Sequence, residues 1–247
     1  MTADVSVGRR PQRLRYETNP RMYRFLRWLF NALMHILYRY EIVDQANFPA
    51  SGPVILVVNH LHLLDPLAVA PAVDRQIVTL AAEKYIPNIL VGTLLRLAGV
   101  IFVHRGEVDR EALRHCADVL SQGQVLAIAP EGTRSKTGAM QQGKPGIAYI
   151  AYRSMRTKAT HATIVPIAIY GDERLSDWLR LKRPSCTVVV GHPFRLPDIE
   201  GKPTTEKFQE LADLVMVKIG LLLPPSYRGV YSERIAAIEA GETQLGV

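Results

Sequence analysis

The sequence has few cysteines: Cys116 and Cys186 are the two among 247 residues. Two cysteines are too few for a disulfide framework, and they fit no paired metal-ligand spacing. We expect both to be thiols of the core in a reducing compartment. The chain also lacks internal repeats, low-complexity tracts and a clear interdomain linker. Its length and its 48% of apolar residues indicate a folded globular protein with one large domain, or one domain and a small appendage.

Acidic residues are scarce in the first 39 residues, where eight arginines are accompanied only by Asp4 and Glu17. Because the whole chain carries +7, this segment holds almost all of the net charge. Such a segment favours an anionic partner, either a lipid surface or nucleic acid. Nucleic acid is the weaker alternative, since the excess of basic residues is confined to one segment and we find no known nucleic-acid-binding motif. The first residues contain no apolar run before a small-residue cleavage site, so we expect no cleaved signal peptide.

A helix is predicted to begin at Asn19 and Pro20, because asparagine is a favourable N-cap and proline fits the first helical position. We expect it to run from about Pro20 to about Tyr40. Its polar residues recur every three or four positions and form one stripe beside a wide apolar face. The polar stripe consists of Arg24, Arg27, Asn31, His35 and Arg39.

Three interpretations of this helix are open. A transmembrane span would bury Arg27 and His35 in hydrocarbon, which is costly. A helix in the membrane interface accounts for the basic stripe, the aromatic rings and the apolar face together. A helix docked on its own domain is the third interpretation, and it can coexist with the second. We expect an amphipathic helix on a membrane surface, in a peripheral protein of the cytoplasmic face.

From Glu41 onward, apolar runs alternate with helical candidates. Runs this apolar are typical of strands buried on both faces, and the alternation predicts an α/β domain with a largely parallel central sheet flanked by helices. We therefore divide the chain into residues 1–40, the basic segment with the membrane-binding helix, and residues 41–247, the α/β domain. Expected strands are Val54–Val58, Ile77–Leu80, Val100–Val103, Val125–Ala129, Ile164–Ile169 and Thr187–Val190. Expected helices are about Pro66–Val73, Pro87–Leu97, Asp109–Gln122, Gly146–Arg156 and Thr205–Leu222.

The first polar segment follows the strand Val54–Val58 and reads Asn-His-Leu-His-Leu-Leu-Asp-Pro over residues 59–66. Its last two residues predict a helix start, so His60 would lie in a strand-to-helix turn. A turn lets Asp65 fold back onto His60, where a carboxylate on one ring nitrogen makes the other a suitable base for an alcohol. Two alternatives remain: Asp65 is only a helix cap, or His60, His62 and Asp65 ligate a metal.

Polar residues also follow two further predicted strands, at Arg105 and at Glu131–Ser135. Parallel strands present ligand-binding groups at their carboxyl ends, where the guanidinium groups of Arg105 and Arg134 could bind a phosphate. Gly132 lets backbone N–H groups approach an anion, and Thr133 offers a hydroxyl. The alternatives are a surface arginine paired with a nearby acid and an ordinary loop.

Pro166 interrupts the apolar run Ile164–Ile169, where proline costs a hydrogen bond of the sheet. It indicates an edge strand, a bulge, or a wall shaped for an apolar ligand.

Taken in order, these segments resemble the four motifs of the glycerophospholipid acyltransferase family, typified by 1-acyl-glycerol-3-phosphate acyltransferases. The family's first motif is a His, four residues and an Asp, matched by His60 and Asp65. The others are a Gly-x-x-Phe-x-x-Arg segment, a Glu-Gly-Thr-Arg-Ser segment and a Val-Pro-Ile strand, matched by Gly99–Arg105, Glu131–Ser135 and Val165–Ile167. The resemblance covers roughly half of the chain, and four motifs in this order and spacing are specific.

The resemblance implies transfer of a fatty acyl chain from a thioester of CoA or acyl carrier protein to the hydroxyl of a lysophospholipid, foremost 1-acyl-glycerol-3-phosphate. His60 would deprotonate the hydroxyl and Asp65 would orient His60, with no acyl-enzyme, metal or other cofactor. The implied acceptor-binding residues are Arg105, Glu131, Gly132, Thr133 and Arg134, with Lys144 as a further basic residue and Pro166 near the acyl chain.

Other functions stay open. The same chemistry could act on glycerol-3-phosphate, another lysolipid or a lipid alcohol. Metal-assisted hydrolysis with His60, His62 and Asp65 is a second class, and a lipid- or nucleic-acid-binding protein without catalysis is a third. His62 departs from the family pattern as a second histidine inside the first motif, but only His60 has the full spacing to Asp65. The sequence leaves the oligomeric state open.

Overall fold

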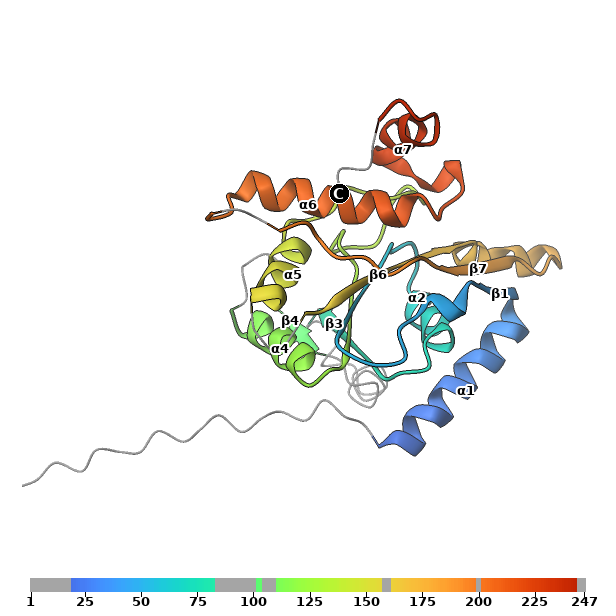
Figure 1. The fold of residues 1–247 in the computed structure, drawn as a ribbon. Coiled ribbons are helices and arrows are strands. Elements are labelled where there is room, and N and C mark those ends of the chain that lie inside the picture. Colours follow the sequence, from blue (N-terminus) through green and yellow to red (C-terminus); the bar gives the residue numbers. More distant parts are fainter. Residues whose placement is uncertain (1–18, 83–100, 104–109, 157–160, 199–200, 244–247) are drawn as a thin grey trace, which may run out of the picture.

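The computed structural model describes residues 19–82, 101–103, 110–156, 161–198 and 201–243, which form a seven-stranded sheet with helices on both faces (Figure 1). The strands are β1 (Arg39–Val43), β2 (Val54–Val58), β3 (Ile77–Ala82), β4 (Ile101–Val103), β5 (Val125–Ile128), β6 (Thr163–Tyr170) and β7 (Ser185–Val190). The α-helices are α1 (Pro20–Leu37), α2 (Asp65–Val69), α4 (Arg110–Ser121), α5 (Gly146–Arg156), α6 (Thr205–Gly220) and α7 (Ser232–Glu239). Short 3-10 helices are η1 (Gln45–Asn47), η2 (Ala70–Ala72), η4 (Asp172–Arg180), η5 (Pro225–Tyr227) and η6 (Gly229–Tyr231).

The order of the strands is β1-β7-β6-β2-β5-β3-β4. The five strands from β6 to β4 run parallel to one another, whereas β7 is antiparallel to β6 and β1 is parallel to β7. The carboxyl ends of these five strands therefore meet at one edge of the sheet, which is where ligands bind in sheets of this kind. The largely parallel sheet flanked by helices confirms the predicted fold class.

The central strands are buried on both faces. Ile55 and Val57 of β2 belong to a hydrophobic cluster with residues of α4, α5 and α6. Val54 and Leu56 point to the opposite face and join a cluster with residues of α1 and α2. This alternation is the period of two that a strand imposes, so the sheet is the middle of three layers. Both cysteines are buried, as predicted for core thiols.

Helix α1 ends earlier than predicted. It begins after an N-cap at Asn19 and ends at Leu37, while Tyr38 has extended backbone. Residues Arg39–Val43 form the edge strand β1, paired with β7, so the prediction of a helix reaching Tyr40 was wrong. The rings of Tyr38 and Tyr40 continue the apolar pattern of the helix. Pairing with β7, which the sequence does not reveal, stabilises a strand there instead.

Helix α1 packs on the domain and still exposes an apolar stripe. Its inner face buries Leu26 and Met34, and Arg27 on its side forms an ion pair with Asp74. On the outer side, five large apolar residues are 41–64% exposed: Met22, Phe25, Trp28, Leu29 and Ile36. In the described part of the chain, no helix is both long enough and apolar enough to cross a membrane. The burial of Leu26 and Met34 against the domain confirms the docked interpretation, and contact with lipid stays a prediction.

Pro166 lies in β6, between β2 and β7, so the edge-strand interpretation was wrong. Ile164 exchanges two backbone hydrogen bonds with Phe194, and the Pro166 carbonyl accepts one from the Gly191 N–H. Backbone groups of alternate residues point to the same side of a strand, so the Pro166 nitrogen faces the stretch between Gly191 and Phe194. There the β6–β7 ladder is interrupted, as the bulge interpretation predicted.

Helix α2 is shorter than expected, since a 3-10 turn replaces its last residues, Ala70–Ala72. The helix predicted at Pro87–Leu97 lies outside the described residues.

Candidate active site

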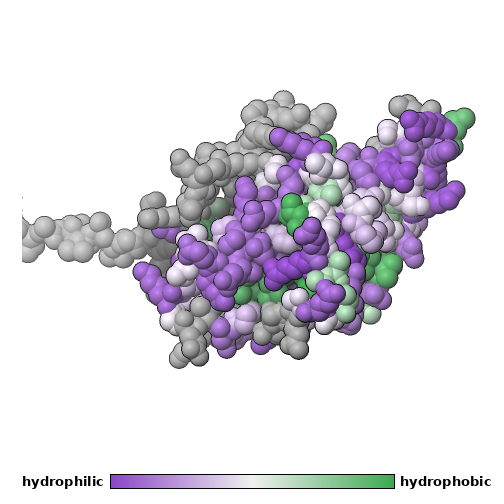
Figure 2. Space-filling view, turned by 90° about the horizontal axis from the view of Figure 1, so that it is seen from above, coloured by the Kyte–Doolittle hydropathy of each residue, from purple (hydrophilic) through white to green (hydrophobic). Residues whose placement is uncertain are grey.

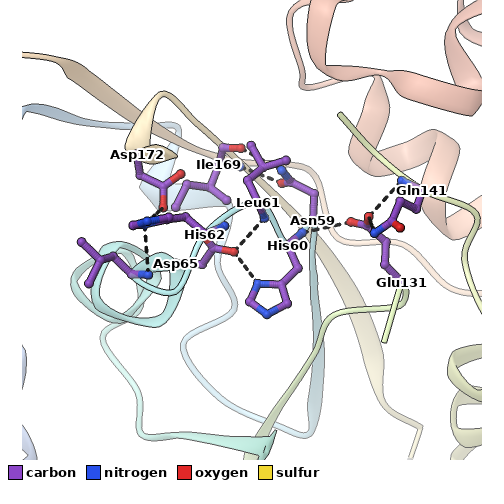
Figure 3. A network of polar contacts seen from close by, with 10 residues as sticks. Asn59, His60, Leu61, His62, Asp65, Glu131, Gln141, Ile169 and Asp172 are labelled. Atoms are coloured by element: carbon purple, nitrogen blue, oxygen red, sulfur yellow. Dashed lines mark hydrogen bonds and ion pairs between the residues drawn. The ribbon is translucent and has the colours of Figure 1, made fainter. Parts of the chain in front are cut away.

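His60 and Asp65 meet at the carboxyl end of β2 (Figure 3). The His60 Nδ1 atom lies 2.5 Å from the Asp65 Oδ2 atom. The imidazole is 22% exposed and the carboxylate only 4%, so the acid lies behind a ring that reaches solvent. The structure thus brings together the two side chains as predicted, and their catalytic roles stay a prediction.

The Asp65 carboxylate does not cap helix α2. Asp65 is the first residue of that helix, and its two oxygens accept hydrogen bonds from the Leu61 N–H at 3.0 Å and the His62 N–H at 2.9 Å. The interpretation of Asp65 as only a helix cap was therefore wrong. Together with the bond from His60, these contacts fix the carboxylate in the turn.

Burial raises the pKa of Asp65 to about 6, while a hydrogen bond with the Asp172 side chain and those from the His62 and Leu61 N–H groups oppose the rise. The carboxylate is therefore ionised at neutral pH. An ionised group in this place favours a proton on His60 Nδ1 and stabilises the ring when its other nitrogen takes up a second proton.

Asn59 holds the beginning of the same turn. Its side-chain amide donates to the Ile169 carbonyl at 2.8 Å and accepts from the Ile169 N–H at 2.9 Å. Because Ile169 belongs to β6, these two bonds fix the end of β2 against its neighbour. Asn59 is thus held both by its place at the end of β2 and by its own buried side chain, which fixes the start of the turn that carries His60.

Glu131 ties the segment after β5 to His60. One carboxylate oxygen accepts from the His60 N–H at 3.0 Å, and the other from the Gln141 N–H at 2.9 Å. The His60 carbonyl in turn accepts from the Ser135 N–H at 2.8 Å. Glu131 is 2% exposed, and burial raises its pKa. It therefore positions the backbone of His60, a role that the sequence analysis missed, and its contact with an acceptor stays a prediction.

Gly132 and Lys144 lie together. Gly132 has a φ of +70°, and a Cβ atom placed on it would lie 3.1 Å from the Lys144 Nζ atom. The Lys144 N–H donates to the Pro130 carbonyl at 2.9 Å, which holds the lysine at this turn. Lys144 and Arg134 are exposed, and Thr133 is half-buried. The structure thus places two cations at the segment after β5.

Two predicted site residues lie apart from this group. Arg105 lies outside the described residues, although β4, the strand before it, ends at Val103 on the same edge of the sheet. Pro166 is buried within β6 beside Val57, before the carboxyl end of the strand. Its proximity to an acyl chain stays a prediction.

Asp172 is a site residue that the sequence analysis missed. It follows β6 directly after Gly171, its side chain is fully buried, and its Oδ2 atom lies 3.9 Å from the His62 Nδ1 atom (Figure 3). A signal was present, because Asp172 closely follows a predicted strand as His60 and Glu131 do. What the sequence did not reveal is that β6 lies next to β2.

The two histidines of the turn face different carboxyl groups. The His60 ring contacts Asp65, whereas the His62 ring pairs with the Asp172 carboxyl group. Over the ranges that the structure describes, no group of three His, Cys, Asp or Glu side chains is placed to hold a metal ion.

The chain resembles proteins of known activity. Human 1-acyl-sn-glycerol-3-phosphate acyltransferase alpha is 29% identical over 170 residues, which cover 65% of this chain and 58% of the human protein. The 1-acyl-sn-glycerol-3-phosphate acyltransferase of Borreliella burgdorferi is 28% identical over 131 residues, which cover 52% of this chain and 50% of that protein. The chain thus spans between half and three fifths of the length of these relatives.

A solved structure shares the fold. The crystal structure of the 1-acyl-sn-glycerophosphate (LPA) acyltransferase PlsC from Thermotoga maritima matches with a TM-score of 0.59 and 18% identity, over 88% of this chain and 80% of that one. The sequence model of the acyltransferase family matches residues 39–170, more than half of the chain. This stretch contains His60, Asp65 and the segment Glu131–Ser135, and the chain therefore belongs to the acyltransferase family.

Proposed function

We propose that the chain transfers a fatty acyl group from an acyl thioester to the hydroxyl of a lysophospholipid, with 1-acyl-glycerol-3-phosphate as the acceptor and phosphatidic acid as the product. The observation that carries this proposal is the 2.5 Å contact between His60 Nδ1 and Asp65 Oδ2 at the carboxyl edge of the sheet. The choice of acceptor is supported by the names of the human and Borreliella relatives. The donor is the thioester of CoA or of acyl carrier protein.

The proposed reaction begins with a proton transfer. Asp65 holds the Nδ1–H of His60, which makes Nε2 the basic nitrogen. Nε2 takes the proton of the acceptor hydroxyl as the hydroxyl oxygen forms a bond with the thioester carbonyl carbon. The tetrahedral intermediate then expels the thiolate, the C–S bond breaks, and the imidazolium returns the proton to sulfur. The products are an ester and a free thiol, and the step requires no acyl-enzyme, metal or other cofactor.

The acceptor phosphate needs cationic partners. Lys144 passes over Gly132, and Arg134 follows two residues later, so two exposed cations lie at the turn after β5. A phosphate bound by arginine and lysine gains charge-assisted hydrogen bonds. We propose these two residues and Arg105 as the phosphate site, with Thr133 as a hydroxyl donor. Pro166 is our candidate for the acyl-chain wall.

The acceptor is a lipid, so the enzyme must reach a membrane. We propose that the exposed apolar stripe of α1 enters the lipid surface, with the neighbouring arginines on anionic headgroups. The side of the molecule that carries α6 and α7, seen from above in Figure 2, is mainly hydrophilic with small hydrophobic areas. This contrast supports α1 as the lipid-facing element. The cytoplasmic face stays the location that we expect from the sequence.

A panel of substrates tests the proposal. Purified chain is incubated with acyl-CoA or acyl carrier protein and with 1-acyl-glycerol-3-phosphate, glycerol-3-phosphate or other lysolipids, and the products are identified by mass spectrometry. We expect phosphatidic acid from 1-acyl-glycerol-3-phosphate. An ester on another acceptor alone would replace our choice of acceptor and keep the chemistry. Thioester hydrolysis without any ester would contradict acyl transfer.

A further inference from the structure

Asp172 is a buried acid that the proposed reaction does not use. It is the first residue of η4, at the carboxyl end of β6, and its side chain is fully buried. Among the described residues, no group donates a hydrogen bond to either of its carboxyl oxygens, and the side chain within hydrogen-bonding reach is the Asp65 carboxylate, which is itself an acceptor. An ionised carboxylate without partners is costly to bury, so such a group takes up a proton or has a function that offsets the cost.

Asp65 and Asp172 differ in their hydrogen-bond donors. Asp65 accepts hydrogen bonds from the Leu61 N–H, the His62 N–H and the His60 ring. These donors favour the charged form of Asp65, and the described residues supply Asp172 with none. Two carboxyl groups that share a buried site do not both ionise readily, so the charge belongs on Asp65 and the proton on Asp172.

The groups around Asp172 agree with this assignment. Burial first, and then the Asp65 carboxylate, raise the pKa of Asp172 to about 9. Within the described ranges, His62 is the one basic group facing it, and its Nδ1 accepts a hydrogen bond from the Leu64 N–H at 3.4 Å in the neutral ring. That nitrogen then carries no hydrogen to donate to Asp172. The titratable groups facing Asp172 are Asp65 on α2, His62 before α2, Glu173 on η4, Tyr38 after α1, Cys186 on β7 and Tyr227 on η5.

The remaining groups supply no positive charge. Burial, foremost, raises the pKa of Tyr38, Cys186 and Tyr227, so these three side chains are neutral. The Glu173 carboxylate accepts from the Tyr227 hydroxyl at 2.7 Å and from the Gly171 N–H at 2.9 Å. A negative charge at Asp172 would therefore be repelled by the Asp65 and Glu173 carboxylates and would gain no compensating charge from Tyr38, Cys186 or Tyr227.

We propose that Asp172 is a positioning residue, which holds a proton behind Asp65 and thereby keeps the negative charge on Asp65 for His60. The proposal rests on the acyl transfer proposed above. If Asp172 were charged instead, Asp65 would tend to take the proton and would no longer be a charged acceptor for the His60 Nδ1–H. The Nε2 atom would then lose its basic character.

The pH dependence of stability tests the proton without any assay of activity. Unfolded aspartate has a pKa of about 3.9, so a folded Asp172 that titrates far above this value binds a proton that the unfolded chain has lost. Stability contributed by this group is full below about pH 4 and is lost as pH rises toward its folded pKa. Asp172→Asn keeps the shape and cannot ionise. We expect its Tm, relative to the wild type, to rise steadily from about pH 5 to about pH 9.

Asp177→Asn is the matched control, because Asp177 also lies in η4 but is partly exposed and paired with Arg174 at 3.5 Å. Its Tm difference from the wild type should stay nearly constant over the same pH range. Parallel curves for Asp172→Asn and the wild type would overturn the assignment of the proton.

Kinetics test the positioning role. We expect Asp172→Ala to lower kcat by about 10- to 100-fold with little change in the acceptor KM, since a displaced base costs rate rather than binding. Asp172→Asn should restore most of kcat, because the amide is also neutral and can donate a hydrogen bond to the Asp65 carboxylate as the protonated acid would. Wild-type kcat in both variants would overturn the role, as would equal losses in both. If the wild type transfers no acyl group to any acceptor, the proposed function fails together with this role, while the Tm series still decides the proton.

Discussion

At the scale of single residues, His60 is held from several directions at once. Its ring contacts Asp65, its N–H donates to Glu131, and its carbonyl accepts from Ser135. The motifs predicted that these residues belong to one site. They did not predict that Glu131 would bond to the backbone of His60, because that contact depends on β2 and β5 being neighbours.

Gly132→Ala tests the phosphate site at the same scale. The substitution places an L residue at a φ of +70° and a Cβ atom against Lys144, so we expect a loss of about 1–3 kcal/mol of stability and a several-fold rise in the acceptor KM. Equilibrium unfolding in urea and steady-state kinetics measure the two effects.

Gly138→Ala is the control for backbone strain, because Gly138 has a φ of +77° and open space where a Cβ would lie. It should lose similar stability and keep the wild-type acceptor KM. Equal KM values in the two variants would mean that Lys144 does not take part in binding the acceptor.

At the scale of elements, the positions of most strands were predicted, but the pairing between strands was not. Six apolar runs correspond to strands of the sheet, because runs buried on both faces need no partner to be recognised. The edge strand β1 was missed, since its residues continue the helical pattern of α1 and become a strand only by pairing with β7. Pro166 fits inside the sheet because the β6–β7 ladder is interrupted between Gly191 and Phe194. This interruption also depends on which strands pair.

Phe25→Asp tests the lipid contact of α1. Phe25 is 54% exposed on the outer stripe, so the substitution should leave the fold intact and weaken binding to anionic vesicles by about tenfold or more, because an apolar side chain leaves the lipid and a charge of the wrong sign enters. Co-sedimentation with vesicles of phosphatidylcholine and phosphatidylglycerol measures it. Val230→Asp is the control, since Val230 is 68% exposed on η6, outside α1. Equal vesicle binding by the two variants would rule out the outer stripe as the lipid-binding surface.

At the scale of the whole molecule, the parallel sheet explains why separate segments form one site. His60, Glu131 and Asp172 follow β2, β5 and β6, whose carboxyl ends lie side by side. The sequence predicted the parallel sheet and most of the strand ends. The order of the strands was not predictable from it, because pairing between distant segments leaves no local pattern. Asp172, which depends on that order, therefore emerged only from the structure.

The central claim is that His60 is the general base, and His60→Ala tests it most directly. The ring is partly exposed, so the variant should fold normally, with a Tm close to that of His192→Ala, a control at another exposed histidine. We expect kcat for acyl transfer to 1-acyl-glycerol-3-phosphate to fall by about 10²–10⁴-fold in His60→Ala and to stay unchanged in His192→Ala. Near-normal turnover by folded His60→Ala would contradict the proposed mechanism.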